Sequence, residues 1–261
     1  MEAPHRFETV LIEDRGSTRL ITLHRPARLN AVNRQLARDV VAALRDAASD
    51  GAAHAIVLTG AGRAFSAGAD LAEARGLSVG EIDGWFRDVA DCYRQVLLVD
   101  KPVVTALNGT AAGAGYQIAL VSDWRVGDAR TRMAQPEINA GLPSIMGSYL
   151  MTFHLPLALN QELSYSGRAM DADECRRVGL LNDLVDSDEL VPRALERAEE
   201  LAGKAGLAFR ATKARFRERV LRDFDDAVRA VVRGMEASYA SGEPQAIMTR
   251  FFESGRKRPD R

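Results

Sequence analysis

Two glycine-rich segments and one glutamate are the parts of this 261-residue sequence whose residue types and spacing could perform chemistry. The first segment reads GAGRAFSAGAD over residues 60–70, and the second reads GAG over residues 113–115. Glycine allows tight turns, so each segment can turn a backbone N–H group outward. Two such groups directed at one oxygen atom form an oxyanion hole, which suits the enolate of a thioester. A helix that begins near Ala114 would add the positive end of its dipole there.

Glu137 is the acid or base that the sequence places beside these segments. Its neighbours are small or apolar: Pro136, Ile138, Ala140, Gly141 and Leu142. Apolar surroundings disfavour the ionised carboxylate and raise its pKa towards the range useful for taking and returning a proton. Either feature alone is more often structural, because glycine turns usually serve the backbone and a single glutamate is usually solvated.

The elements that must position these residues alternate between strands and helices. Strands are indicated by short apolar or alternating runs, and helices by apolar residues at helical spacing. The predicted order is a hairpin (residues 10–14 and 18–25), a helix capped by Asn33, a strand (55–59), a helix (82–97) and a strand (103–107). Each glycine-rich segment therefore follows a strand, as in an α/β fold.

The rest of the chain is predicted to be mostly helical. A helix begins near Ser144 or Ile145, and Asp171 with Glu174 resembles a capping box. From about Glu189 onward almost everything is helical. An apolar stripe on this last part is too wide for a solvated helix, so we expect it to pack on the main domain or on another subunit, and we favour packing that is partly between subunits. The stripe consists of Phe224, Val228, Val231, Val232, Met235 and Tyr239. We divide the chain into a core, residues 1–188, and a helical C-terminal region, residues 189–261.

Composition excludes several classes of protein. The net charge is -1 with Lys and Arg spread along the chain, so no nucleic-acid partner is expected. No apolar run reaches the roughly 18 residues of a membrane span and the N-terminus does not resemble a signal peptide, so we expect a cytoplasmic protein without a membrane partner. Cys92 and Cys175 lack CxxC or Cys/His spacing, so neither thiol chemistry nor a metal site is expected.

Three strings together resemble the crotonase (enoyl-CoA hydratase/isomerase) superfamily: RAFSAGADL from Arg63, NGTAAGAGYQIA from Asn108 and QPEINAG from Gln135. The resemblance continues in RPARLNAV near residue 25, in SGRAMDADECRRVGLLNDLV from Ser166 and in RFFESGRK near the end, so it covers nearly the whole chain. It implies a spiral of ββα units with a helical C-terminal oligomerisation region that assembles a homotrimer or a hexamer.

The resemblance also implies roles for particular residues. The thioester oxygen would be held by the N–H groups of Ala67 and Ala114, with Glu137 as the acid/base. Coenzyme A, as part of the substrate and not as a separate cofactor, would lie along Ala27, Arg28, Leu29, Ala67, Ala69, Asp70 and Leu71. Arg256 or Lys257 could reach the phosphates bound by a neighbouring subunit.

One residue departs from the family pattern. Hydratases of this family use two glutamates, and Gln117 occupies the position of the first. Glutamine can orient a group by hydrogen bonds but cannot accept a proton. A single carboxylate is enough to shift a double bond, so we expect isomerisation ahead of hydration. Decarboxylation, hydrolysis and a non-catalytic coenzyme A-binding subunit remain alternatives; a nucleotide enzyme is disfavoured, because Phe65 replaces the third glycine of GxGxxG.

Other polar residues near the motifs have structural interpretations. Asp70 is expected to order the first segment by accepting backbone N–H bonds, and the Ser66 hydroxyl to fit the turn. His24 and His154 are predicted to lie away from both segments. Aromatic residues on the helix over 82–97 are expected to be mostly core, with some contact to an acyl chain left open: Trp85, Phe86 and Tyr93.

Overall fold

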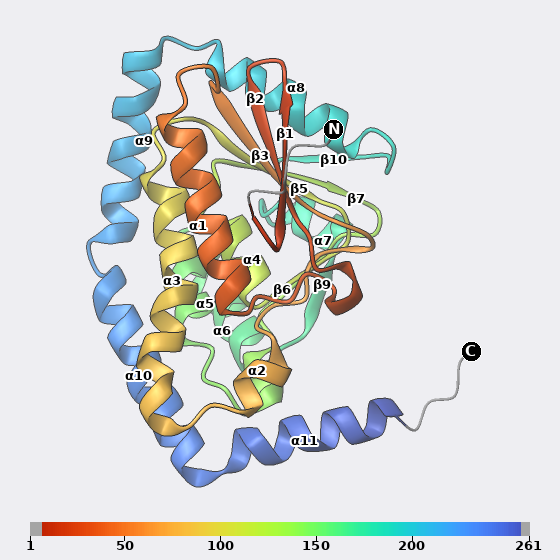
Figure 1. Ribbon diagram of the computed structural model, residues 1–261, viewed down its shortest axis with the longest axis vertical. Helices are drawn as coiled ribbons and strands as arrows, with labels where there is room; N and C mark the ends of the chain where they lie inside the picture. Colours follow the sequence, from red (N-terminus) through yellow and green to blue (C-terminus); the bar gives the residue numbers. More distant parts are fainter. Residues whose placement is uncertain (1–6, 257–261) are drawn as a thin grey trace.

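The computed structural model describes residues 7–256 as a two-sheet α/β fold (Figure 1). The main sheet has the order β1-β2-β3-β5-β7-β10, and a smaller sheet has the order β4-β6-β8-β9. The main-sheet strands are β1 (Val10–Arg15), β2 (Thr18–Leu23), β3 (Ala55–Gly60), β5 (Val103–Leu107), β7 (Trp124–Asp128) and β10 (Asp183–Val185). The strands of the smaller sheet are β4 (Ala64–Ser66), β6 (Thr110–Ala112), β8 (Arg132–Ala134) and β9 (Ala169–Asp171).

The helices surround these sheets. Those before the C-terminal region are α1 (Arg34–Ser49), α2 (Leu71–Arg75), α3 (Ile82–Leu98), α4 (Ala114–Leu120), α5 (Ile145–Met151), α6 (Leu157–Ser166) and α7 (Ala172–Arg177). The last four are α8 (Leu190–Ala202), α9 (Gly206–Leu221), α10 (Phe224–Ser241) and α11 (Glu243–Arg256). Short 3-10 turns are η1 (Pro26–Arg28), η2 (Val79–Glu81) and η3 (Glu137–Ala140).

Three strand pairs give the fold its repeat. In β3–β4, β5–β6 and β7–β8 the first strand joins the main sheet and the second joins the smaller sheet. Helical segments follow each pair, and the strands pair in parallel between repeats. This arrangement confirms the predicted spiral of ββα units. It also stacks the turns that follow β4, β6 and β8, which are the three segments singled out in the sequence.

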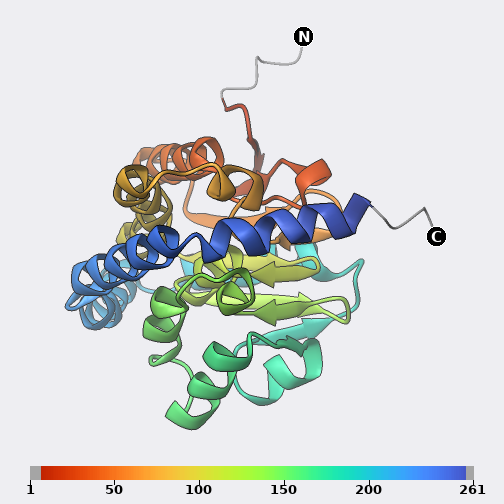
Figure 2. The same ribbon diagram turned by 90° about the horizontal axis from the view of Figure 1, so that it is seen from below.

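Residue alternation along the strands explains the layers. Successive side chains of β3 point to opposite faces, so Ile56 and Leu58 join the main core, whereas Val57 faces α8. Helices α1 and α3 pack together and cover the first face, as Figure 2 also shows. The side chain of Asn33 accepts the Leu36 N–H at 2.9 Å and so caps α1, as predicted. The hairpin of β1 and β2 is confirmed as well.

The C-terminal helices follow the outside of the spiral. Figure 1 shows α9 and α10 running beside α3, with α11 turning back across the end near α2. The apolar stripe of α10 is buried against α3 and α5 of the same chain. The predicted packing on the main domain is therefore confirmed, while the favoured packing partly between subunits stays a prediction. Helix α8 packs on the main sheet, while the division at residues 188 and 189 stays a prediction.

Within residues 7–256, no helix combines the length and apolar composition that a membrane crossing requires. Arg256 ends α11, and the prediction that Arg256 or Lys257 binds phosphates of a neighbouring subunit lies outside the described side chains.

Candidate active site

The two glycine-rich segments touch each other at a pair of glycines. Gly68 has φ +94°, and a β-carbon there would lie 2.8 Å from the carbonyl oxygen of Ala112. Gly113 has φ +48°, and a β-carbon there would lie 3.6 Å from the Cα of Gly68. Only glycine satisfies both the backbone conformation and this close approach. The residues that follow, Ala69 and Ala114, are brought together for that reason.

Ala69 and Ala114 carry the backbone donors that are free to bind an oxyanion. Ala114 is the first residue of α4, where the N–H group has no acceptor within the helix. Among the described residues, neither N–H group donates a hydrogen bond. Both residues line the same small cavity. Two unengaged N–H groups at one cavity, one of them at a helix N-terminus, are what stabilisation of an enolate oxygen requires.

The prediction that Ala67 supplies the first donor was wrong. Its N–H group donates to the carbonyl oxygen of Leu29 at 2.9 Å and is therefore already engaged. Leu29 adopts a left-handed conformation, φ 49°, at the end of η1. Leu29, in the segment before α1, thus accepts the N–H of Ala67. The N–H of Ala69, two residues later, stays unengaged. The prediction for Ala114 fits the geometry.

Glu137 lies over the junction of the two segments. It begins η3, directly after Pro136. A β-carbon added to Gly113 would lie 3.0 Å from Oε1 of Glu137, so the carboxylate rests on that glycine, next to Ala114. Oε1 accepts a hydrogen bond from Nε2 of Gln117 at 2.9 Å. Oε2 is enclosed and has no hydrogen-bond partner among the described residues.

Burial raises the pKa of Glu137 to about 7, and the polar groups close to its carboxylate, namely its own backbone and the side chains of Gln135 and Gln117, offset this effect only in part. Part of the residue remains accessible at the rim, but its carboxylate lies in the enclosed region. Near neutral pH both protonation states are populated. The group can therefore accept a proton from carbon and return it.

Gln117 and Gln135 form a buried amide pair beside Glu137. They are 3 % and 1 % exposed, and Nε2 of Gln117 also lies 3.3 Å from Oε1 of Gln135. Gln135 packs against Gly147 of α5, where a β-carbon would lie 1.9 Å from its Cδ. Any larger residue at Gly147 would displace Gln135. The sequence analysis did not assign Gln135 a role; its position two residues before Glu137 was the available indication.

The cavity at this junction is a chamber of about 40 Å³. Glu137 is its one carboxylate within the described part of the chain, and most of its wall is apolar. Aromatic side chains that the sequence placed mainly in the core also form this wall. The lining residues are Ala69, Trp85, Phe86, Val89, Tyr93, Ala114, Gln117, Gln135, Glu137, Leu142, Pro143, Met146, Val231 and Met235.

The residues predicted to bind coenzyme A lie near one another. Asn30, which is fully buried, donates through its side-chain amide to the carbonyl oxygens of Ala61 and Ala64. This contact ties η1 to the first glycine-rich segment. It brings the predicted coenzyme A contacts close to one another. Among these contacts only Asp70 is buried. The predicted contacts are Ala27, Arg28, Leu29, Ala67, Ala69, Asp70 and Leu71. The coenzyme site itself stays a prediction.

Asp70 and Ser66 make the backbone hydrogen bonds that were expected of them, while the coenzyme A contact of Asp70 stays a prediction. Asp70 caps α2 through the N–H of Ala72 at 3.0 Å and forms an ion pair with Arg25 at 2.9 Å. Ser66 donates to the carbonyl oxygen of Asn30 at 2.8 Å. His24 is exposed at a strand end, and His154 lines a different cavity beneath α9, so neither histidine lines the chamber.

Comparison with known proteins identifies the family that the sequence motifs resemble. The family model described as enoyl-CoA hydratase/isomerase matches residues 13–258. A probable enoyl-CoA hydratase of Rhizobium meliloti is 39 % identical over 197 residues, which are 75 % of this chain and 76 % of the relative. Carboxymethylproline synthase of Pectobacterium carotovorum is 35 % identical over 206 residues, 78 % of this chain and 82 % of the relative.

Solved structures have the same fold. The crystal structure of an enoyl-CoA hydratase/isomerase from Mycobacterium paratuberculosis superposes with a TM-score of 0.84 at 26 % identity, over 94 % of this chain and 99 % of that one. The matched motifs, the ββα spiral and the family model all lead to one assignment. The chain belongs to the enoyl-CoA hydratase/isomerase family of the crotonase superfamily.

Proposed function

We propose that the protein binds an acyl-CoA thioester with its carbonyl oxygen between the N–H groups of Ala69 and Ala114, while Glu137 moves a proton on the acyl group. The observation that carries this proposal is the shared chamber, because two unengaged donors and a carboxylate with a raised pKa all line it. The donors stabilise the enolate oxygen. Oε2 of Glu137, which has no partner among the described residues, is the oxygen that takes the proton.

Within this family we propose double-bond migration ahead of hydration. Hydration requires a water molecule that is both held and deprotonated at the chamber. Gln117 provides an amide there, and its Nε2 is committed to Glu137. An amide cannot accept the proton of water, whereas one carboxylate can remove a proton from C2 or C4 and return it to the other carbon. Glu137 alone is sufficient for double-bond migration.

Hydration is the second candidate. It is favoured by the Rhizobium meliloti relative, which is named as a probable enoyl-CoA hydratase. The Pectobacterium relative, at similar identity, is named as a synthase. Relatives at this level of identity therefore differ in their named reactions, and identity alone does not choose between them.

The direct experiment offers the purified protein but-3-enoyl-CoA and crotonyl-CoA. The first should be converted to the conjugated thioester, which absorbs in the ultraviolet, and the second should be hydrated slowly. Gln117→Glu should raise hydration, since it adds a second carboxylate beside Glu137. Rapid hydration of crotonyl-CoA by the unaltered protein, without double-bond shift, would contradict the isomerase proposal.

We also propose that the chain assembles as a homotrimer or as a hexamer. Support comes from large apolar side chains that the single chain leaves exposed, since a contiguous patch of such groups marks an interaction site. They include Leu157, Tyr165, Leu207 and Phe216. Sedimentation velocity would test the assembly, and a monomer at micromolar concentration would contradict it.

A further inference from the structure

The walls of the chamber are fixed on two sides, so the chamber cannot widen easily for a long acyl group. On one side Trp85 of α3, 2 % exposed, donates through Nε1 to Oε2 of Glu73 at 2.8 Å. The same carboxylate oxygen accepts the backbone N–H of Arg34 at 3.1 Å. The indole ring cannot swing aside without breaking this partly buried hydrogen bond. It is therefore a rigid wall.

On the other side, α10 closes the chamber with Val231 and Met235, which are 2 % and 3 % exposed. This helix is held at two points that flank Met235. Gly234 packs so closely on Pro143 that a β-carbon would lie 3.1 Å from its Cγ. The hydroxyl of Tyr239 donates to the carbonyl oxygen of Ala74 at 2.9 Å. A long acyl chain could not push α10 outward without losing both contacts.

The volume of the chamber then limits the length of the acyl chain that fits. The chamber holds about 40 Å³. A water-sized group needs ~10–15 Å³, so the chamber has room for only a few such groups. The carbonyl group at Ala69 and Ala114 takes up part of that room, so only a short acyl chain fits beside it.

We propose that this chamber selects short acyl groups, of about four carbons, and that Met235 of α10 sets the length limit. The inference rests on the proposed acyl-CoA function and narrows its substrate class. Met235 is suited to this role because it is a flexible side chain on the part of the wall that α10 supplies, and truncation to alanine removes the atoms beyond Cβ while Trp85, Gln117 and Glu137 stay unchanged.

Binding of saturated acyl-CoA thioesters, which have no double bond to shift or hydrate, tests the limit separately from catalysis. By titration calorimetry the unaltered protein should bind butanoyl-CoA at least roughly tenfold more tightly than octanoyl-CoA. Met235→Ala should reduce that ratio roughly tenfold, because the opened space accepts about two more methylenes. Val231→Ala opens the same wall by less and should shift the ratio in the same direction, which covers the case that Met235→Ala folds poorly.

Met151→Ala is the matched control, because Met151 is equally buried in α5 but does not line the chamber. It should leave the butanoyl-to-octanoyl ratio unchanged. Equal affinity of the unaltered protein for both thioesters, with each bound more tightly than coenzyme A, would overturn the length limit and leave the proposed function standing. Failure to bind any acyl-CoA would overturn the proposed function, and the length limit with it.

Discussion

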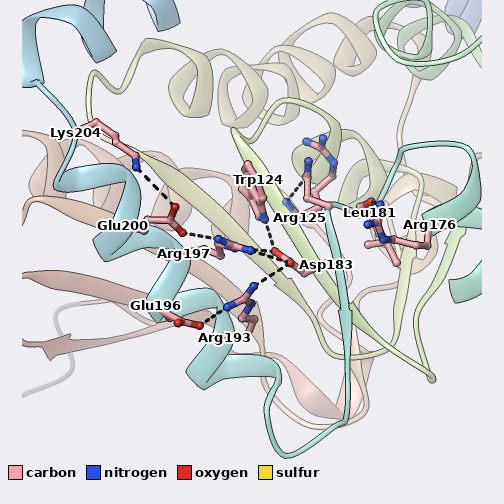
Figure 3. Close-up of polar contacts among 11 residues, drawn as sticks. Trp124, Arg125, Arg176, Leu181, Asp183, Arg193, Glu196, Arg197, Glu200 and Lys204 are labelled. Atoms are coloured by element: carbon pink, nitrogen blue, oxygen red, sulfur yellow. Dashed lines mark hydrogen bonds and ion pairs between the residues drawn. The ribbon is translucent and has the colours of Figure 1, made fainter.

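Two carboxylates in different parts of the fold, Asp183 and Glu137, have opposite electrostatic surroundings. Asp183 begins β10 and accepts hydrogen bonds from Nε1 of Trp124 at 2.6 Å and from Nε of Arg197 at 3.1 Å, with an amino group of Arg193 at 3.3 Å (Figure 3). Both arginines belong to α8 and also pair with Glu200 and Glu196 of that helix. The whole network fastens α8 to the sheet edge.

The pKa values of the two groups move in opposite directions. Burial alone would raise the pKa of Asp183, but the hydrogen bonds from Arg197 and Trp124 outweigh that effect and hold it below its ordinary value. Glu137 is also enclosed, but its partners are neutral amides, and its pKa rises to about 7. Enclosure therefore yields a structural anion where cations surround the group, and a proton carrier where they do not.

The largest effect should come from removing the proton carrier. Glu137→Gln keeps the shape of the side chain but cannot accept a proton, so kcat for the double-bond shift should fall about 10²- to 10⁴-fold. Steady-state kinetics with but-3-enoyl-CoA measures it. Asp183→Asn should leave kcat unchanged, and a comparable loss in both variants would contradict the separation of roles.

Displacing the carboxylate should have the next largest effect. Gly113→Ala places a β-carbon 3.0 Å from Oε1 of Glu137, which must then move by a few tenths of an ångström. Since a misplacement on the order of 1 Å costs about 10²-fold, kcat should fall roughly three- to tenfold. Gly179→Ala is its control, because that glycine also has positive φ, +84°, but nothing within 4 Å of the added carbon. Both variants carry backbone strain. Only Gly113→Ala should lose activity, and equal kcat in the two would show that Glu137 need not lie where it does.

Replacing each carboxylate by its amide should change the free energy of unfolding in opposite directions. Asp183→Asn leaves Arg193 and Arg197 without their shared anion and should lower the free energy of unfolding by about 1–3 kcal/mol. Glu137→Gln should raise the free energy of unfolding at pH 8 by about 1–3 kcal/mol, because it removes a poorly solvated charge. Urea unfolding at pH 8 measures both, and a destabilised Glu137→Gln would contradict the raised pKa.

The pH dependence gives the smallest and finest test. The folded-state pKa of Glu137 lies above the ordinary value of 4.5, so the folded protein binds the proton more tightly than the unfolded chain does. The contribution of this group to stability is thus full below about pH 4.5 and is lost as the pH rises through about 7. Activity that needs the ionised base should rise over the same upper range and level off above it. A profile of kcat/KM that is flat between pH 5 and 8 would contradict this assignment.

Local patterns in the sequence were sufficient for most of the fold. Asn33 and Asp171 accept N–H groups at the starts of α1 and α7, as their capping patterns predict. The strand at 103–107 has the predicted bounds. These features depend on neighbours within a few residues, so spacing alone is informative. The burial of the α10 stripe was also predicted, on the main domain or on another subunit, but the sequence did not decide between these two partners.

The sequence by itself determined that two glycine-rich turns and Glu137 belong to one kind of site, because residue type and order along the chain carry that information. Only the tertiary structure decided that the N–H of Ala69, and not that of Ala67, is unengaged, since the acceptor that takes the other comes from Leu29, on a separate segment. The structure likewise decided that α10 closes the chamber beside Glu137. Hydrogen bonds and walls between distant segments arise from packing, which no local pattern encodes.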